Sequence, residues 1–157
     1  MAIRNIRTEE DPVLRKVCRK VENFDDRLFL ILEDMRDTLI KSGGIGLAAN
    51  QIGILRRIVL VNFDDKIIEL INPEIIETEG QQIEAEACLS VPKKAGKTLR
   101  PKTVTVRAQN RNGNWCIYKG TDLKARCFCH ELDHLDGKLY LDRLAPGEKA
   151  FFTNDYE

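Results

Sequence analysis

Residues 121–135 read TDLKARCFCHELDHL, and this stretch holds both histidines of the 157-residue chain. His130 and His134 are four residues apart, so on an α-helix they stand one turn apart on the same face and can converge on one ion. Glu131 follows the first histidine and completes an H-E-x-x-H pattern, in which two histidines bind a metal and the carboxylate acts as a general base. The stretch therefore predicts a helix that binds a catalytic divalent metal ion.

The same helix is expected to lie in the protein core. Thr121 or Asp122 can cap its first turn, and Gly137 can end it. The side away from the histidines is apolar and consists of Ala125, Phe128, Leu132 and Leu135. A helix that is apolar on most sides is usually buried, which makes it a rigid platform for a metal site.

The segments around this helix predict a mixture of helices and short strands. A long helix is expected from Asp25 or Asp26 to Gly43, because apolar residues recur there at helical spacing. Strands are expected over 57–63, 66–72 (ended by Pro73), one or two within 74–90, 104–108 and 115–119, the last two joined by a hairpin turn at 110–114. Shorter elements are expected as a helix over 12–18, a strand over 139–141 and a helical turn or two after Pro146. We predict an α+β fold in which short antiparallel strands pack around the buried metal-binding helix, as a single catalytic domain over residues 1–157.

Composition narrows the class of protein. Hydrophobic residues make up 43% of the chain and charged residues 32%, and the formal net charge is zero. A neutral balance does not favour a specific nucleic-acid partner, which would require a basic excess. The first residues contain no apolar signal-peptide core, and no apolar run is long enough to cross a bilayer. The odd number of cysteines, five, argues against a disulfide framework. We therefore expect a cytoplasmic protein without a membrane partner.

Two histidines do not complete a metal site, and spacing alone leaves the third ligand open. The candidates are Asp136, Asp142, Glu148 and the cysteines. Cys88 is modestly favoured, because its segment 86–92, EACLSVP, stops being a strand at Pro92 and a strand end is well placed to face a cleft. Cys127 lies on the ligand face but one turn back, where it is expected to line a pocket.

Three segments together resemble the peptide deformylase family. Residues 44–51 (GIGLAANQ), 86–90 (EACLS) and 130–134 (HELDH) match the family patterns G-x-G-L-A-A-x-Q, E-G-C-L-S and H-E-x-D-H in the same order. The chain departs from the pattern at Ala87, which replaces a glycine. The resemblance implies hydrolysis of the N-formyl group of N-formyl-methionyl nascent peptides, with release of formate.

The resemblance also implies a set of site residues. Cys88, His130 and His134 would hold one divalent ion, Fe(II) in the cell, with Ni, Co or Zn as replacements. Glu131 would transfer the proton, while the Gln51 side-chain amide and the Leu89 backbone N–H would stabilise the oxyanion. For the peptide, the implied contacts are backbone groups of Ile45, Gly46 and Ala87 and a methionine pocket lined by Leu123 and Cys127.

Two further expectations follow from the resemblance. Arg100 is expected to pair with Glu86 or Asp133. The residues after His134 contain no basic C-terminal helix of the kind that longer members use for ribosome docking, so any contact with the ribosome is expected to be transient.

Several alternatives remain open on the residues alone. A zincin-like endopeptidase would use a carboxylate as third ligand. A purely structural zinc site would use Cys88, Cys127 and both histidines, and would make Glu131 dispensable. A nucleophilic Cys88 paired with a histidine would need no metal. Without the resemblance, Gln51 is best interpreted as an amide that stabilises its loop.

Overall fold

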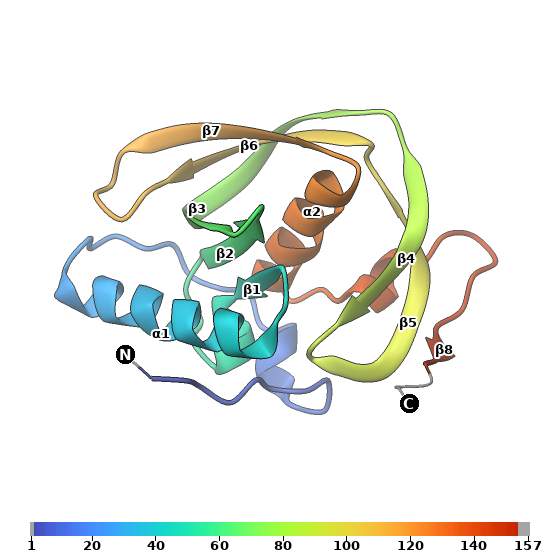
Figure 1. The fold of residues 1–157 in the computed structure, drawn as a ribbon, viewed down its shortest axis with the longest axis horizontal. Coiled ribbons are helices and arrows are strands. Elements are labelled where there is room, and N and C mark those ends of the chain that lie inside the picture. The colour runs from blue at the N-terminus through green and yellow to red at the C-terminus, as the bar shows by residue number, and fades with distance from the viewer. Residues whose placement is uncertain (1, 154–157) are drawn as a thin grey trace.

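The computed structural model describes residues 2–153, which form two α-helices, three short 3-10 helices and eight strands (Figure 1). The helices are α1 (Asp26–Ser42), α2 (Leu123–Leu135), η1 (Pro12–Arg15), η2 (Ala49–Ile52) and η3 (Tyr140–Arg143). The strands are β1 (Gly46–Ala48), β2 (Ile58–Phe63), β3 (Lys66–Glu79), β4 (Gln82–Cys88), β5 (Val91–Arg100), β6 (Thr103–Gln109), β7 (Trp115–Thr121) and β8 (Phe151–Phe152).

The strands form two antiparallel sheets around α2. The larger sheet has the order β1-β2-β3-β6-β7, and the smaller sheet has the order β4-β5-β8. In Figure 1, α2 lies in the middle of the molecule with the long strands bent around it, and α1 lies outside it, next to β1 and β2. This arrangement confirms the predicted α+β class and the central position of the histidine-bearing helix.

Helix α1 begins and ends where its sequence predicts. The Asp25 side chain accepts a hydrogen bond from the backbone N–H of Leu28 at 3.1 Å, and Gly43 ends the helix with a φ of 71°. The apolar side of the helix packs on strand β2 and its neighbours in one core cluster, whose members on α1 are Leu28, Leu32, Met35 and Leu39.

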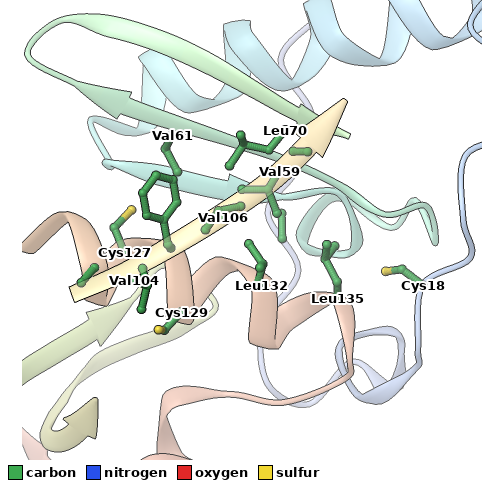
Figure 2. Packing of buried hydrophobic residues seen from close by; sticks show 14 residues of the cluster. Cys18, Val59, Val61, Leu70, Val104, Val106, Cys127, Cys129, Leu132 and Leu135 are labelled. Atoms are coloured by element: carbon green, nitrogen blue, oxygen red, sulfur yellow. The ribbon is translucent and has the colours of Figure 1, made fainter. Parts of the chain in front are cut away.

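A second core cluster fixes α2 against the larger sheet. Figure 2 shows Val59, Val106 and Leu132 among the packed side chains, which come from β2, β6 and α2. Strand β2 serves both clusters, because Val59 and Val61 face α2 while Ile58 and Leu60 belong to the α1 side. Both faces of β2 are therefore covered, which explains its unbroken apolar sequence.

Two of the expected strand limits are wrong. Strand β3 does not end at Pro73 but continues to Glu79. Its pairing with β6 shifts register between Ile71 and Glu74, so the missing N–H of Pro73 falls in an irregularity rather than in a regular ladder. In the same way, Pro92 does not stop a strand but stands second in β5, next to the turn that joins β4 and β5.

The ends of the described chain also differ from expectation. The first helix is a single 3-10 turn, η1, rather than a helix to residue 18. Residues 139–141 are not a strand, because the Asp142 side chain accepts from the Leu139 N–H at 3.0 Å and folds this segment into η3. No helix follows Pro146 in the described part; instead Phe151–Phe152 pairs with β5 as β8.

At the start of α2, Thr121 belongs to β7, and Asp122 precedes the helix with a φ of 58° and no side-chain capping bond. No helix within residues 2–153 combines the length and the apolar character that are needed to span a membrane.

Candidate metal centre and active site

Three side chains from two separate segments converge at the middle of the molecule. Cys88 ends β4, and His130 and His134 stand one turn apart on α2. Their sulfur and ring nitrogen atoms all lie within 4.8 Å of one another, and Cys88 Sγ is 3.4 Å from His134 Nε2. The Nδ1 atom of the fully buried His134 has no hydrogen-bond partner. One thiol and two imidazoles at this spacing fit a divalent transition metal.

The other candidate ligands point elsewhere. Asp136 pairs with Arg57 at 2.9 Å, and Asp142 pairs with Arg15. Cys127 is buried with its Sγ 3.7 Å from the carbonyl oxygen of Ile45. Among the described residues, the candidate metal group contains neither these carboxylates nor Glu148 nor Cys127.

A buried carboxylate orients the first histidine. Glu86 lies 2.9 Å from His130 Nδ1 and accepts from Arg100 at 2.8 and 3.0 Å and from the hydroxyl of Thr98. Burial by itself raises the pKa of Glu86, but the bonds to His130 and Arg100 lower that pKa to about 2. Glu86 thus holds the His130 ring by Nδ1 and leaves Nε2 for an ion, which is the usual support of a metal-binding histidine.

Arg100 links this carboxylate to the ligand helix. Its guanidinium also donates to Asp133 at 2.7 Å, and Asp133 in turn accepts from Arg143. The expected pairing of Arg100 is confirmed with both partners. Only 4% of Arg100 is exposed, so this is a buried ionic network rather than a surface pair.

Glu131 lies beside the metal group and against β1. Its side chain is buried, and its Oε1 atom has no hydrogen-bond partner. Burial raises the pKa of Glu131 to about 7, although the nearby His130 acts in the opposite direction. A carboxyl group with a pKa near neutrality can both accept and release a proton under cellular conditions.

The side chain of Gln51 is fixed by hydrogen bonds next to Cys88. Its Oε1 accepts from the Ala48 N–H at 2.9 Å, and its Nε2 donates to Ser90 Oγ at 3.0 Å and lies 3.8 Å from Cys88 Sγ. Gln51 therefore does stabilise its loop, as the residues alone suggest, but its amide nitrogen also faces the metal group. Leu89 lies in the turn between β4 and β5 beside it.

An open groove of about 540 Å³ passes over these groups. Its walls include every predicted site residue except His134, which lies behind them: Ile45, Gly46, Gln51, Ala87, Cys88, Leu89, Leu123, Cys127, His130 and Glu131. Sequence reasoning missed the supporting residues Ser90 and Thr98, since a lone hydroxyl in a strand or turn carries no local signal. It also missed the wall residues Lys93 and Lys94.

The model of the family described as polypeptide deformylase matches residues 3–150. The chain belongs to the peptide deformylase family. A peptide deformylase of Finegoldia magna is 54% identical, with 92% of this chain and 91% of that protein covered. One from Agathobacter rectalis is 49% identical over the whole chain and covers 98% of that protein.

Solved deformylase structures share the fold. The enzyme of Thermotoga maritima matches with a TM-score of 0.90 and 37% identity over 93% of this chain and 100% of that one. The enzyme of Legionella pneumophila matches with a TM-score of 0.89 and 40% identity over 92% and 88%. A structure from Synechococcus elongatus, solved in complex with actinonin, matches with a TM-score of 0.87 and 35% identity over 90% and 79%.

Membership of the deformylase family confirms the resemblance that the three sequence motifs carry. The chain is a peptide deformylase, a hydrolase that removes the N-formyl group from nascent peptides. This decides against the endopeptidase, the purely structural zinc site and the metal-free cysteine nucleophile.

Proposed function

We propose that Cys88, His130 and His134 hold the catalytic metal ion of this deformylase, below an N-formyl-methionyl peptide in the groove. The convergence of the three ligand atoms within 4.8 Å, next to Glu131, carries this proposal. The mixed sulfur and nitrogen donors suit Fe(II) as the ion in the cell, with Ni, Co or Zn as replacements. When bound, such an ion supplies Lewis acidity and lowers the pKa of water toward neutrality.

Glu131 is the proposed proton carrier. The water oxygen bonds to the formyl carbon while Glu131 takes the water proton, and the C–N bond then breaks as the same proton passes to the leaving amine. The products are formate and a peptide with a free amino terminus. A pKa of about 7 for Glu131 supports both halves of this transfer.

Gln51 and Leu89 are the proposed donors to the oxyanion. The tetrahedral intermediate carries a negative oxygen, and neutral N–H groups held in place stabilise it without any rearrangement. The fixed position of the Gln51 amide, through Ala48 and Ser90, supports this role.

The peptide is expected to bind as an extended strand between Ile45 and Gly46 on one side and Ala87 on the other. The pairing of β4 with β5 shifts between Glu86 and Cys88, which supports Ala87 as a place where backbone groups remain for the substrate. Leu123 and Cys127, on the first turns of α2, would line the methionine pocket. Because the substrate is a nascent peptide, we place the enzyme in the cytoplasm with at most transient ribosome contact.

The test is formate release from formyl-Met-Ala-Ser by anaerobically purified protein, with metal analysis of the same sample. Glu131→Gln should keep the metal and the fold and lose at least about 100-fold in kcat. Cys88→Ser should lose both metal and activity, whereas Cys116→Ser, on β7 and outside the groove, should retain both. Full activity of Glu131→Gln, or full metal content of Cys88→Ser, would contradict these assignments.

A further inference from the structure

Arg126 forms part of the groove wall and plays no role in the proposed chemistry. It precedes His130 by four residues on α2, so it stands one turn away on the same face of the helix. Its Nη2 donates to Gln82 Oε1. Gln82 is itself fixed, because its Nε2 donates to the carbonyl oxygens of Pro101 at 3.0 Å and Asp122 at 2.9 Å. The Arg126 guanidinium is therefore held in one orientation by a neutral partner.

The same guanidinium is left incompletely paired. Its Nε atom is buried and has no hydrogen-bond partner, and Arg126 forms no ion pair with a carboxylate of residues 2–153. The buried Nε atom is closed to a ligand, but the guanidinium group lines the groove and carries a charge that no carboxylate of residues 2–153 balances. A carboxylate is therefore the ligand group that this cation would attract most strongly.

The remaining charges of the groove favour the same ligand. Lys93 and Lys94, near the start of β5, also line the groove. Lys94 pairs with Glu9 at 3.5 Å, whereas Lys93 has no carboxylate partner in the described part of the chain. Among residues 2–153, the acidic lining residues are Glu86, which is held by Arg100, and Glu131, which lies at the reacting end. Away from the metal group, the described lining of the groove is therefore cationic.

We propose that this deformylase prefers nascent peptides with aspartate or glutamate at the second or third residue, and that Arg126 is the specificity-determining residue. The inference rests on the function proposed above. Residues one turn apart on a helix are about 6 Å apart, and an extended peptide advances about 3.3 Å per residue. A peptide whose formyl group lies at the metal would thus bring its second residue to the level of Arg126, and the long arginine side chain would also reach the third.

The preference is measured with pairs of peptides that differ only in charge. Formyl-Met-Glu-Ala and formyl-Met-Ala-Glu are compared with formyl-Met-Gln-Ala and formyl-Met-Ala-Gln, all amidated at the C-terminus so that no terminal carboxylate interferes. We expect kcat/KM for one glutamate peptide to exceed that of its glutamine counterpart by about tenfold in low salt. The ratio should shrink in 0.5 M salt, because added ions screen the attraction.

Arg126→Gln should bring the Glu/Gln ratio close to 1. The ratio does not depend on the fraction of active enzyme, so a partial loss of folded protein cannot imitate this result. Lys124→Gln is the matched control, since it removes the same charge from α2 but faces Asp64, outside the groove; it should keep the wild-type ratio.

Two outcomes would overturn the inference while leaving the proposed function intact. The first is formate release from the glutamine peptides with a wild-type ratio of 1 or less at both positions. The second is a preference that survives in Arg126→Gln, which would remove Arg126 from the explanation. If none of the peptides releases formate, both the inference and the proposed function fail.

Discussion

Glu86 is a charged carboxylate in the protein interior, and its environment gives the stability of the folded state a defined response to acid. Although burial opposes the charge, His130 and Arg100 hold the pKa of Glu86 at about 2, below its ordinary value of 4.5. A group with a lowered pKa stabilises the folded state fully above 4.5, and this stabilisation is lost as the pH falls from 4.5 toward 2.

We predict that this loss is visible in urea unfolding of the metal-free protein between pH 5 and 2.5. Glu86→Gln should lower the free energy of unfolding by up to about 3 kcal/mol at pH 6 and by progressively less toward pH 2.5. Glu84→Gln, an exposed position on the same strand, is the control and should change little at any pH. A Glu86→Gln effect that stays constant over this pH range would mean that Glu86 is not charged in the folded state.

At the scale of single residues, the sequence predicts the groups proposed to carry the chemistry better than the groups that support them. His130, Glu131 and His134 are found from spacing, because helical geometry alone places them together. Cys88 could only be favoured modestly over Asp136 or Asp142, since no local rule relates a strand end to a helix more than forty residues later. Ser90 and Thr98 are recognisable only once β4 and β5 are paired.

Among the elements, strand β1 approaches helix α2 closely at Gly46. A methyl group built on Gly46 would lie 2.5 Å from Glu131 Oε2 and 2.7 Å from its Cγ. The absence of a side chain at residue 46 thus allows the strand to lie directly against the carboxyl group of Glu131, the proposed proton carrier.

Gly46→Ala should therefore displace the Glu131 side chain, with a loss of about 100-fold in kcat, because small misplacements of a catalytic group are costly. The metal content should stay at the wild-type level, because the nearest atoms to a methyl group on residue 46 belong to Glu131 and not to the three proposed ligands. Gly44→Ala, in the loop just before β1, serves as the control, because the new methyl would meet the flexible end of Leu89 at 3.2 Å. Equal activities of the two variants would show that strand β1 moves to make room and that the Glu131 side chain keeps its position.

Element boundaries were predictable where one local signal decides them. Asp25 and Gly43 bound α1 as expected, and the unbroken apolar run of β2 reflects burial on both faces. The two prolines led to wrong strand limits, because the cost of a missing N–H depends on its place in the hydrogen-bond ladder between strands. Pro73 lies in a register shift and Pro92 beside a turn, and neither circumstance is visible without the partner strand.

On the scale of the whole molecule, the candidate active site is assembled from segments that lie far apart in the sequence. The loop before β1, the turn after β4 and helix α2 each contribute one wall of the groove. The prediction of a single domain over residues 1–157 is consistent with this arrangement and stays a prediction. An ion held by Cys88, His130 and His134 would join the end of the smaller sheet to α2, which packs on the larger sheet.

Removal of the metal should therefore weaken the molecule as a whole and not only its chemistry. An ion that binds the folded chain at 100 times its Kd stabilises it by about 2.7 kcal/mol, which for a domain of this size raises Tm by roughly 5–10 °C. We expect a chelator to lower Tm of the anaerobic enzyme by this amount, and added Ni(II) or Zn(II) to restore it. Cys88→Ser should unfold near the Tm of the stripped protein and gain much less from added metal. If the chelator removed the ion and left Tm unchanged, the ion could not be bridging the two sheets in the way that these three ligands require.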